Sequence, residues 1–372
     1  MVEIKNQLFY FNAILKYLHN THVCAGRVII FHNLNLRRMK KLTTLLFSLL
    51  FVSLLVAFII SCGGVEQTFD STADEFPESM ISNSNCAKPN MRIDVNLNKK
   101  FCGNEECTIP FAGYQWWTNY QFRPDPYWFY NIGQAWSPRG PWVDSEGLHL
   151  RVMKDNLGGG DSWCASEVVL VYQGETGQTL ANVDYGTYLV AAKIKTANSF
   201  AELDRNVAFG LFTYDPSETG GPYNKARELD LAEISKWGAP PDKNVIDKRL
   251  LVGNAQFTLQ DWQKLDNLHR YSIPAGVKEV TLVMYWPGPK KPVTFKQYNG
   301  IYKTIESLPS TPANTWTTSA QQNDYIPDDG CQRFHMNLWM GNYGEVDNKG
   351  THPGPSNGQA QEVVVTNFVY KR

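Results

Sequence analysis

The segment Glu228-Leu229-Asp230-Leu231-Ala232-Glu233-Ile234 decides the local fold of this chain. Side chains alternate between the two faces of a regular β-strand, so Glu233 would lie among the leucines, on the face opposite Glu228 and Asp230. A carboxylate buried there without a partner would be strongly destabilising. One extra residue, a β-bulge near Ala232, returns Glu233 to the acidic face and Ile234 to the core. The segment therefore predicts a bulged strand with three carboxylates on one face.

The rest of the chain from about residue 91 to residue 372 has the texture of an all-β protein. Short apolar alternations are divided by Gly, Pro, Asn and Asp, and no long helical period appears. This pattern is typical of a β-sandwich or barrel. Examples are Leu148 to Val152, Tyr188 to Ile194, Val207 to Tyr214, Val280 to Trp286 and Val363 to Tyr370. We expect residues 287–330, rich in Pro, Thr, Ser and Asn, to form a long loop.

Composition narrows the classes of function. The 372 residues carry a net charge of -1, which gives no electrostatic reason to expect a nucleic-acid partner. Aromatic residues make up 13% of the chain and include 11 Trp. Most of them must serve the core, but Trp-rich exported chains also stack sugar rings in clefts.

The N-terminal region resembles an export signal. Met39-Lys40-Lys41 precedes the apolar run Leu42 to Ile60, and Ser61-Cys62 follows it. The junction is similar to a bacterial lipobox, in which Cys62 is lipidated and becomes the new N-terminus. The same run could instead remain as a membrane-spanning helix. We expect residues 1–62 to be an extension and lipoprotein signal peptide, residues 63–90 a flexible tether, and residues 91–372 one secreted, lipid-anchored domain at the cell envelope.

Five cysteines follow Cys62. An exported protein permits disulfides, and Cys102 and Cys107 enclose a short loop, so they are the expected pair. The odd number leaves at least one thiol unpaired and the connectivity open. The five are Cys86, Cys102, Cys107, Cys164 and Cys331. No CxxC or histidine cluster suggests a metal site or another cofactor.

Three acids on one strand face point to acid–base chemistry. Neighbouring carboxylates raise one another's pKa, which keeps one of them protonated near neutral pH. Retaining glycoside hydrolysis needs this asymmetry, namely an ionised nucleophile beside a protonated general acid. A solvated acidic strand is the alternative interpretation of the same pattern.

Ordered motifs give the chain a family resemblance. Glu228 to Glu233 resembles the signature of glycoside hydrolase family 16 in the bulged form of laminarinases and agarases, and His335 to Gly341 resembles that family's Met-Asn-Leu-Trp segment. Further pieces in the family's order are Cys164-Ala165-Ser166-Glu167, Tyr185-Gly186-Thr187-Tyr188, Phe209 to Tyr214, Leu268 to Ile273 and Val365 to Tyr370. Together they cover roughly residue 111 to the C-terminus.

The resemblance implies a concanavalin A-like jelly roll of two curved antiparallel sheets with a sugar cleft. It implies that Glu228 is the nucleophile, that Asp230 assists it, and that Glu233 is the acid/base. The expected substrate-binding residues, partly from the resemblance and partly from tryptophans in loop-like stretches, are Glu167, Phe212, Tyr214, Asn337, Trp339, Trp116 and Trp163. Trp117 and Trp136 are the other two tryptophans of these stretches.

The chain departs from the family pattern at three places. Val169 stands where lichenase-like members have Arg, and Thr258 stands where they have Asn. Some relatives bind structural calcium partly through an Asp of the closing strand, near which this chain has Asn367. The metal and the polysaccharide therefore both stay open.

Taken together, the sequence predicts an endo-acting retaining glycosidase, a hydrolase that degrades a β-linked polysaccharide: a β-1,3- or mixed-linkage glucan, or a related galactan. We expect a monomer whose partners are this polysaccharide and, through the lipid anchor, the membrane. One alternative is a carbohydrate-binding jelly-roll surface lipoprotein without turnover, and another is a structural surface lipoprotein. Hydrolysis and transglycosylation are not distinguished by the sequence.

Overall fold

The computed structural model separates the chain into two units, residues 1–71 and 72–372, and every described residue belongs to the second. The described residues are 108–119, 135–155, 162–174, 177–180, 183–215, 225–236, 253–261, 264–328, 332–340 and 354–372. The predicted signal, Cys62, the tether and every later cysteine except Cys164 lie outside them. Within these ranges no helix is long and apolar enough to span a bilayer.

The first sheet carries the acidic segment. Its strands pair in the order β1, β2, β6, β16, β9, β10, β11 and β12, all antiparallel. Their bounds are β1 Thr108–Phe111, β2 Tyr114–Thr118, β6 Ser162–Gly174, β16 Arg333–Met340, β9 Val207–Tyr214, β10 Glu228–Ile234, β11 Ala255–Leu259 and β12 Leu268–Tyr271. The hairpin partner β7 (Gly177–Leu180) extends the far end of β6.

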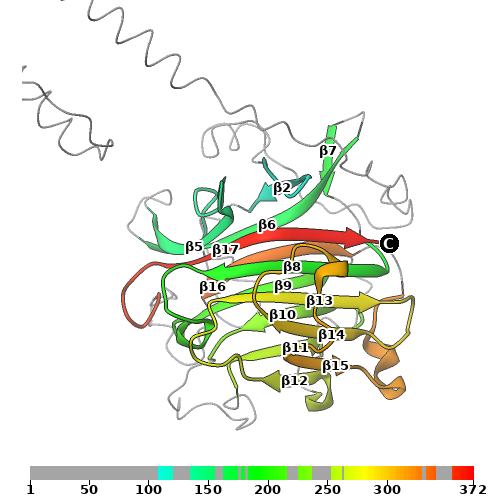
Figure 1. Ribbon diagram of the computed structural model, residues 1–372. Helices are drawn as coiled ribbons and strands as arrows, with labels where there is room; N and C mark the ends of the chain where they lie inside the picture. Colours follow the sequence, from blue (N-terminus) through cyan, green and yellow to red (C-terminus); the bar gives the residue numbers. More distant parts are fainter. Residues whose placement is uncertain are drawn as a thin grey trace, which may run out of the picture. The chain divides into compact units, whose positions relative to one another are not determined.

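The second sheet is antiparallel as well, in the order β4, β5, β17, β8, β13, β14 and β15 (Figure 1). Its strands are β4 Trp142–Asp144, β5 Gly147–Asp155, β17 Gln361–Lys371, β8 Gly186–Ile194, β13 Glu279–Trp286, β14 Thr294–Asn299 and β15 Asn314–Thr317. The β5–β6 hairpin joins the two sheets, and the short β3 (Ala135–Trp136) runs parallel to β6.

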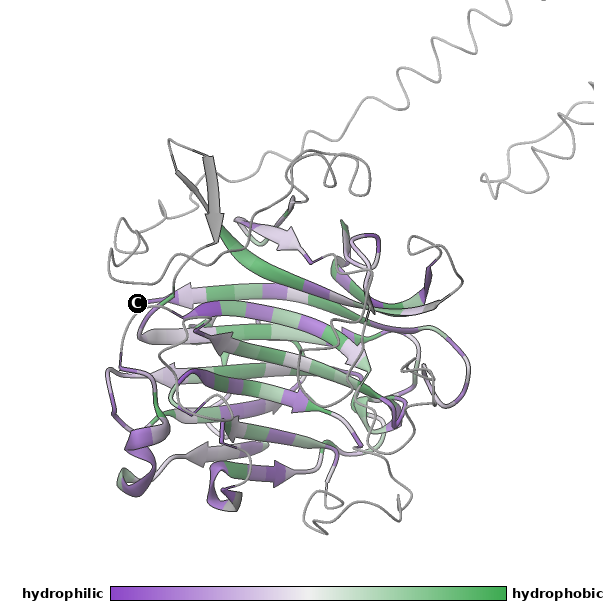
Figure 2. Ribbon diagram, turned by 180° about the vertical axis from the view of Figure 1, so that it is seen from behind, coloured by the Kyte–Doolittle hydropathy of each residue, from purple (hydrophilic) through white to green (hydrophobic). Residues whose placement is uncertain are grey.

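The inner faces of the two sheets form one hydrophobic core. Figure 2 shows hydrophobic and hydrophilic residues alternating along the strands, which is the pattern of a sheet with one face buried. Completely buried rings include Trp116 and Phe209 from the first sheet and Trp286 and Phe295 from the second. The predicted all-β jelly-roll sandwich is confirmed.

Residues 287–330 are not the long loop that their composition suggested. They contain β14 and β15, which add two strands to the edge of the second sheet next to β13. A 3-10 helix, η6 (Ile305–Ser307), lies between these two strands, and a second, η7 (Ala320–Tyr325), follows β15. Buried Val293 and Phe295 tie β14 to the core, but the many Pro, Thr, Ser and Asn residues of the segment hid the strands in the sequence.

Candidate active site

The predicted β-bulge is present in β10. The register with both neighbouring strands shifts within residues 230–233, so the extra residue restores the alternation that a regular strand would lose. The pairs with β9 are Glu228–Tyr214, Asp230–Phe212, Ala232–Leu211 and Glu233–Gly210. Leu229, Leu231 and Ile234 are completely buried in the core. The three carboxylates lie on the other face, as the sequence predicted.

The strands next to β10 place a row of side chains beside each carboxylate. On one side of β10, the β9 residues opposite the carboxylates pair with residues of β16, which lie on the same face of the sheet. On the other side of β10, two residues of β11 lie opposite Asp230 and Glu233. The β16–β9 pairs are Arg333–Tyr214, His335–Phe212, Asn337–Gly210 and Trp339–Ala208; the β11 residues are Thr258 and Gln256. We call Glu228, Asp230 and Glu233 the acidic face.

Asp230 is the deeply buried member of the acidic face, with 1% of its surface exposed. Burial, and after it the charges of Glu228 and Glu233, raise the pKa of Asp230 well above its usual range. A protonated Asp230 can donate a hydrogen bond to Glu228, and the Gln260 amide donates to both carboxyl groups. The Gln260 Nε2 lies 2.9 Å from Asp230 Oδ2 and 3.5 Å from Glu228 Oε1. The arrangement favours a neutral Asp230 that donates to the Glu228 carboxyl group.

Glu233 has a separate environment at the other end of the face. Burial raises its pKa, while a hydrogen bond from Gln256 and the charge of Arg270 act in the opposite direction. The Gln256 amide donates to Glu233 through Nε2 and accepts from Arg270 through Oε1 at 3.2 Å. Arg270 thereby fixes which way this amide points. The arrangement holds a carboxyl group whose pKa lies above its usual range, as a general acid requires.

Glu167 and His335 are hydrogen-bond partners on the same side of the sheet. His335 Nδ1 lies 3.1 Å from Glu167 Oε1, and the imidazole stacks on Phe212 with ring centroids 4.7 Å apart. The Asn119 amide also donates to Glu167. Glu167 therefore orients His335, and its own carboxylate is already engaged by protein groups.

Asn337 and Gly210 lie between Glu167 and Glu233. Among the described residues, the buried Oδ1 of Asn337 has no hydrogen-bond partner. A Cβ atom added at Gly210 would lie 2.4 Å from this oxygen, so only glycine leaves room for it. Trp339, partly exposed, follows two residues later on the same face. These residues offer a floor on which a ring could lie beside Glu233.

Tyr214 closes the opposite end of the face, beside Glu228. Arg227 donates to its phenolic oxygen at 3.1 Å, and the guanidinium carbon lies 5.1 Å from the ring centre. Burial raises the Tyr214 pKa, and the neighbouring Arg227 opposes that shift. Tyr214 therefore remains a neutral phenol next to a cation.

The prediction for Trp116 is wrong. Trp116 lies on β2 rather than in a loop, is completely buried, and packs edge-on against Phe334 and Phe368 in the core. Its neighbour Trp117 pairs with Val169 on the acidic side but is only 4% exposed. Neither ring offers a face to a sugar.

Trp163 and Trp136 are also in strands, not loops. Trp163 lies at the end of β6 that pairs with β5 rather than with β16, so it is not among the rows beside the carboxylates. The Lys154 ammonium lies 5.7 Å from the centre of its ring, and Gly354 packs against the same ring. Trp136, on β3, pairs with Ala165 on β6.

Sequence reasoning missed the polar residues that support the carboxylates. Gln256 and Arg270 were absent from the prediction, as were Gln260, Arg227 and Arg333. The alternation of β11 held a usable signal, because Gln256 and Thr258 are polar residues between completely buried apolar ones. The sequence does not show that β11 pairs with the bulged strand β10. It therefore could not reveal that Gln256 lies opposite Glu233 and Thr258 opposite Asp230.

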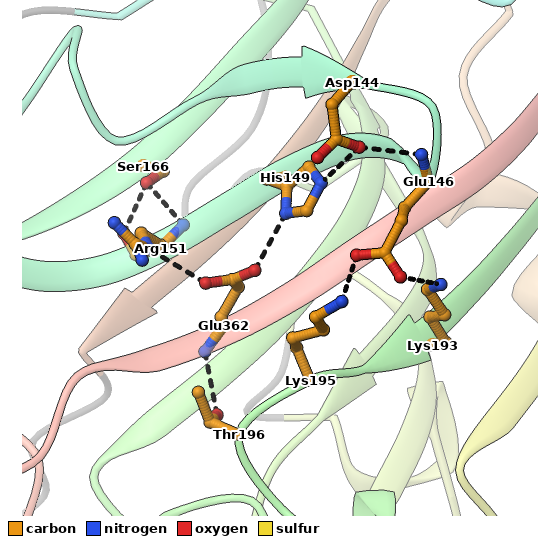
Figure 3. A network of polar contacts seen from close by, with 9 residues as sticks. All are labelled: Asp144, Glu146, His149, Arg151, Ser166, Lys193, Lys195, Thr196 and Glu362. Atoms are coloured by element: carbon orange, nitrogen blue, oxygen red, sulfur yellow. Dashed lines mark hydrogen bonds and ion pairs between the residues drawn. The ribbon is translucent and has the colours of Figure 1, made fainter. Parts of the chain in front are cut away.

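A second group of acids lies on the second sheet, far along the chain from the first. Within the described residues, Asp144, Glu146 and His149 have ligand atoms within 4.8 Å of one another (Figure 3). Each acid already has a basic side chain as a partner. Glu146 accepts from Lys193 at 2.8 Å and from Lys195, and His149 lies between Asp144 at 2.9 Å and Glu362 at 2.8 Å. We call Asp144, Glu146 and Glu362 the paired corner.

The paired corner does not fit a calcium ion. Calcium takes about six to eight oxygen ligands, whereas here the oxygens are engaged by ammonium groups, an imidazole and, at Glu362, the Arg151 guanidinium at 2.9 Å. Asn367, which lies near the place where the family resemblance suggested a calcium-binding Asp, donates its amide to the Lys303 carbonyl at 2.6 Å. The Cys164 thiol is buried, and this burial raises its pKa to about 11.

Comparison with known proteins finds similarity among solved structures. No family model matches the chain, and no curated protein matches it. A lichenase from a mouse hindgut metagenome is 15% identical, covering 69% of this chain and 92% of that chain, with a TM-score of 0.39. The laminarinase catalytic domain of Thermotoga maritima is 13% identical over 64% of this chain and 83% of its own, with a TM-score of 0.34.

A third solved structure is described as an immunostimulatory antigen and pseudo-β-1,3-glucanase of Mycobacterium tuberculosis. It is 13% identical, covers 71% of this chain and 95% of its own, and has a TM-score of 0.42. At such identities the chain's own side chains have to carry any assignment of function.

Proposed function

We propose that this protein cleaves a β-linked polysaccharide by a retaining mechanism in which Glu228, Asp230 and Glu233 perform the chemistry. The observation that carries the proposal is the bulge in β10, which brings three carboxylates to one strand face and leaves two of them with raised pKa values. A solvated acidic strand would hold its carboxylates ionised and exposed. Burial of this kind is typical of catalytic carboxyl groups.

In the first step Glu228 attacks the anomeric carbon of the sugar. The hydrogen bond from protonated Asp230 and the Gln260 amide hold the Glu228 carboxylate in place. As the Glu228–carbon bond forms, the bond to the leaving oxygen breaks, and Glu233 gives its proton to that oxygen. The raised pKa of Glu233 supports this role as general acid.

In the second step the roles of Glu233 reverse. As a carboxylate it takes a proton from water, whose oxygen attacks the anomeric carbon while the bond to Glu228 breaks. Gln256, held by Arg270, can keep donating to Glu233 in both states because its amide orientation is fixed. Two displacements return the original anomeric configuration.

The substrate backbone follows from the sequence resemblance: a β-1,3- or mixed-linkage glucan, or a related galactan, cut within the chain. A direct test measures reducing-end release across a panel of β-linked polysaccharides, with the anomeric configuration of the first product followed by NMR. We expect oligosaccharides of retained configuration. Binding of a polysaccharide without any release of ends would instead indicate the carbohydrate-binding alternative.

We further propose export and lipidation at Cys62, because a basic start, an apolar run and a cysteine follow one another at residues 39–62. Two acyl chains would give stable membrane attachment, whereas one chain gives only marginal binding. Mass spectrometry of the mature N-terminus should find an acylated Cys62. An unmodified Cys62, or a retained apolar segment, would contradict the proposal.

A further inference from the structure

Two guanidinium groups flank Tyr214 at the Glu228 end of the acidic face. Arg333 on β16 pairs with Tyr214 on β9, which in turn pairs with Glu228 on β10. Arg227 immediately precedes Glu228 and stacks on the Tyr214 ring. Both cations are therefore within two strands of the proposed nucleophile.

Neither guanidinium has an ion-pair partner among the described residues. Arg227 donates to two neutral oxygens, the Asp215 carbonyl at 2.9 Å and the Tyr214 hydroxyl. Arg333 is only 4% exposed, and its Nε has no hydrogen-bond partner in the described part of the chain. Burial lowers its pKa to about 10, and the nearby Asp215 charge opposes that shift. Buried guanidinium groups normally have carboxylate partners.

Arg333 Nε is the first of three buried polar atoms that follow one another along β16. Arg333 Nε, His335 Nε2 and Asn337 Oδ1 are buried polar atoms without partners among the described residues, and they occur at alternate positions of β16. Alternate residues lie on one strand face, roughly 6–7 Å apart. This face is the one that carries the three carboxylates on β10. A donor, an imidazole nitrogen and an acceptor in a line suit a chain of sugars, and the guanidinium end suits an anion.

We propose that Arg333, with Arg227 beside it, binds an anionic substituent of the polysaccharide, a sulfate ester or a carboxylate, on a sugar close to the cleavage point. The inference rests on the proposed function for the position of that sugar relative to Glu228. A planar guanidinium binds either oxyanion through two parallel hydrogen bonds. The anion would supply an ion-pair partner, which Arg333 does not have among the described residues.

The test measures binding by affinity electrophoresis, with the Glu233→Gln variant as the parent so that turnover does not interfere. The probes are a β-glucan and a β-galactan, each in neutral, sulfated and carboxylated form. We expect the anionic forms to bind more tightly, and Arg333→Met to weaken their binding by about tenfold to a hundredfold, as for charged hydrogen bonds. Binding of the neutral forms should change by less than about twofold.

Two further variants separate charge from fold. Arg333→Lys keeps the charge but loses the planar fork, so its affinity should be intermediate. Arg139→Met is the matched control, because the Arg139 side chain is 52% exposed and pairs with Asp155. Melting temperatures identify a variant that fails to fold. Should Arg333→Met unfold, competition by inorganic sulfate in the unaltered parent decides, since sulfate must displace the anionic polysaccharide but not the neutral one.

The outcomes separate this inference from the proposed function. Equal losses on neutral and anionic probes, or no preference for anionic probes in the parent, would overturn the anionic subsite. Suppose that the wild-type chain and Arg333→Met cleave a neutral polysaccharide equally fast, and that anionic forms are neither bound preferentially nor cleaved. The proposed function then stands and the anionic subsite is wrong. If no polysaccharide is cleaved but anionic ones bind in an Arg333-dependent way, the subsite stands and the function fails. The sulfated and carboxylated arms decide which anion it takes.

Discussion

The acidic face and the paired corner use the same residue types to opposite effect. In the paired corner a hydrogen bond from His149 lowers the pKa of Asp144, and hydrogen bonds from Lys193 and Lys195 lower that of Glu146 to about 2. On the acidic face, burial raises the pKa of Asp230 and Glu233. The difference is the supply of cations, which the paired corner has at hydrogen-bond distance (Figure 3).

This contrast shows which carboxylates the fold uses for stability. Carboxylates beside cations favour the ionised form and hold strands together. Carboxylates buried beside one another are unfavourable for folding, and such sites are characteristic of catalysis. Substitutions in the two regions should therefore separate activity from stability.

The largest effect is expected from Glu228→Ala. Without the nucleophile the covalent intermediate cannot form, so turnover should fall by several orders of magnitude while the fold persists. External azide should restore activity by attacking from the vacated side, which gives a sugar azide of inverted configuration. The measurements are initial rates with and without azide and NMR of the product.

Two companions make this test specific. Glu233→Ala should still form the intermediate from a substrate with a good leaving group, and azide should then give a product of retained configuration. Glu362→Gln, in the paired corner, should leave turnover unchanged. Exchanged azide products would exchange the roles of Glu228 and Glu233, and full activity in either alanine variant would end the catalytic assignment.

A smaller loss of activity is expected from Gly210→Ala. The new Cβ would lie 2.4 Å from Asn337 Oδ1, so the amide must move from the floor beside Glu233. We expect kcat/KM to fall by about a hundredfold, the size of effect that misplacement near the reacting atoms can cause. The matched control is Gly276→Ala, where a Cβ would meet nothing within 4 Å, although its φ of +82° carries some strain. Equal activity of the two variants would show that the Asn337 position does not matter.

Local patterning was sufficient to predict the bulge. Leu229, Leu231 and Ile234 had to be buried together, and only an extra residue reconciles this with three carboxylates on one face. The all-β class followed from the same alternation elsewhere. Both predictions depend on the period of a single strand, which a sequence displays directly.

Neither the pairing of the strands nor the burial of individual side chains could be predicted in the same way. Trp116 and Trp117 are adjacent and chemically identical, yet one is in the core and the other faces the acidic side, because only the register of β2 with β6 distinguishes them. Gln256 reaches Glu233 through a pairing across the bulge, and Arg270 reaches Gln256 through the next strand. Such partners are set by long-range register, which local propensity does not determine.

In the paired corner, Glu362→Ala should reduce stability rather than activity. His149 and Arg151 would lose their shared acceptor, and His149 is buried. We expect the free energy of unfolding to fall by about 2 kcal/mol, as when a buried hydrogen-bonding group loses its partner. Urea titrations followed by tryptophan fluorescence measure this. A change below about 0.5 kcal/mol, the usual range of surface substitutions, would show that the corner does not stabilise the sheet.

The smallest effect, and the one that tests the contrast most directly, is expected from Asp230→Asn. Because the Asp230 pKa is raised in the folded state, its stabilising contribution is complete below the unfolded value of about 3.9 and is lost as pH rises through the folded value. Asn keeps the acceptor for Gln260 and a donor for Glu228 but cannot ionise. The variant should therefore melt about 2 °C higher than the wild type at pH 8, corresponding to about 1 kcal/mol, with no gain at pH 4.

Asp144→Asn provides the control of opposite sign for this experiment. The lowered pKa of Asp144 means that its contribution is present above the unfolded value and is lost as pH falls through the folded one. This variant should melt below the wild type at pH 8, and the difference should shrink in acid. If Asp230→Asn instead behaves like Asp144→Asn, then Asp230 is ionised in the folded protein, and it cannot be the hydrogen-bond donor that holds Glu228 ready for attack.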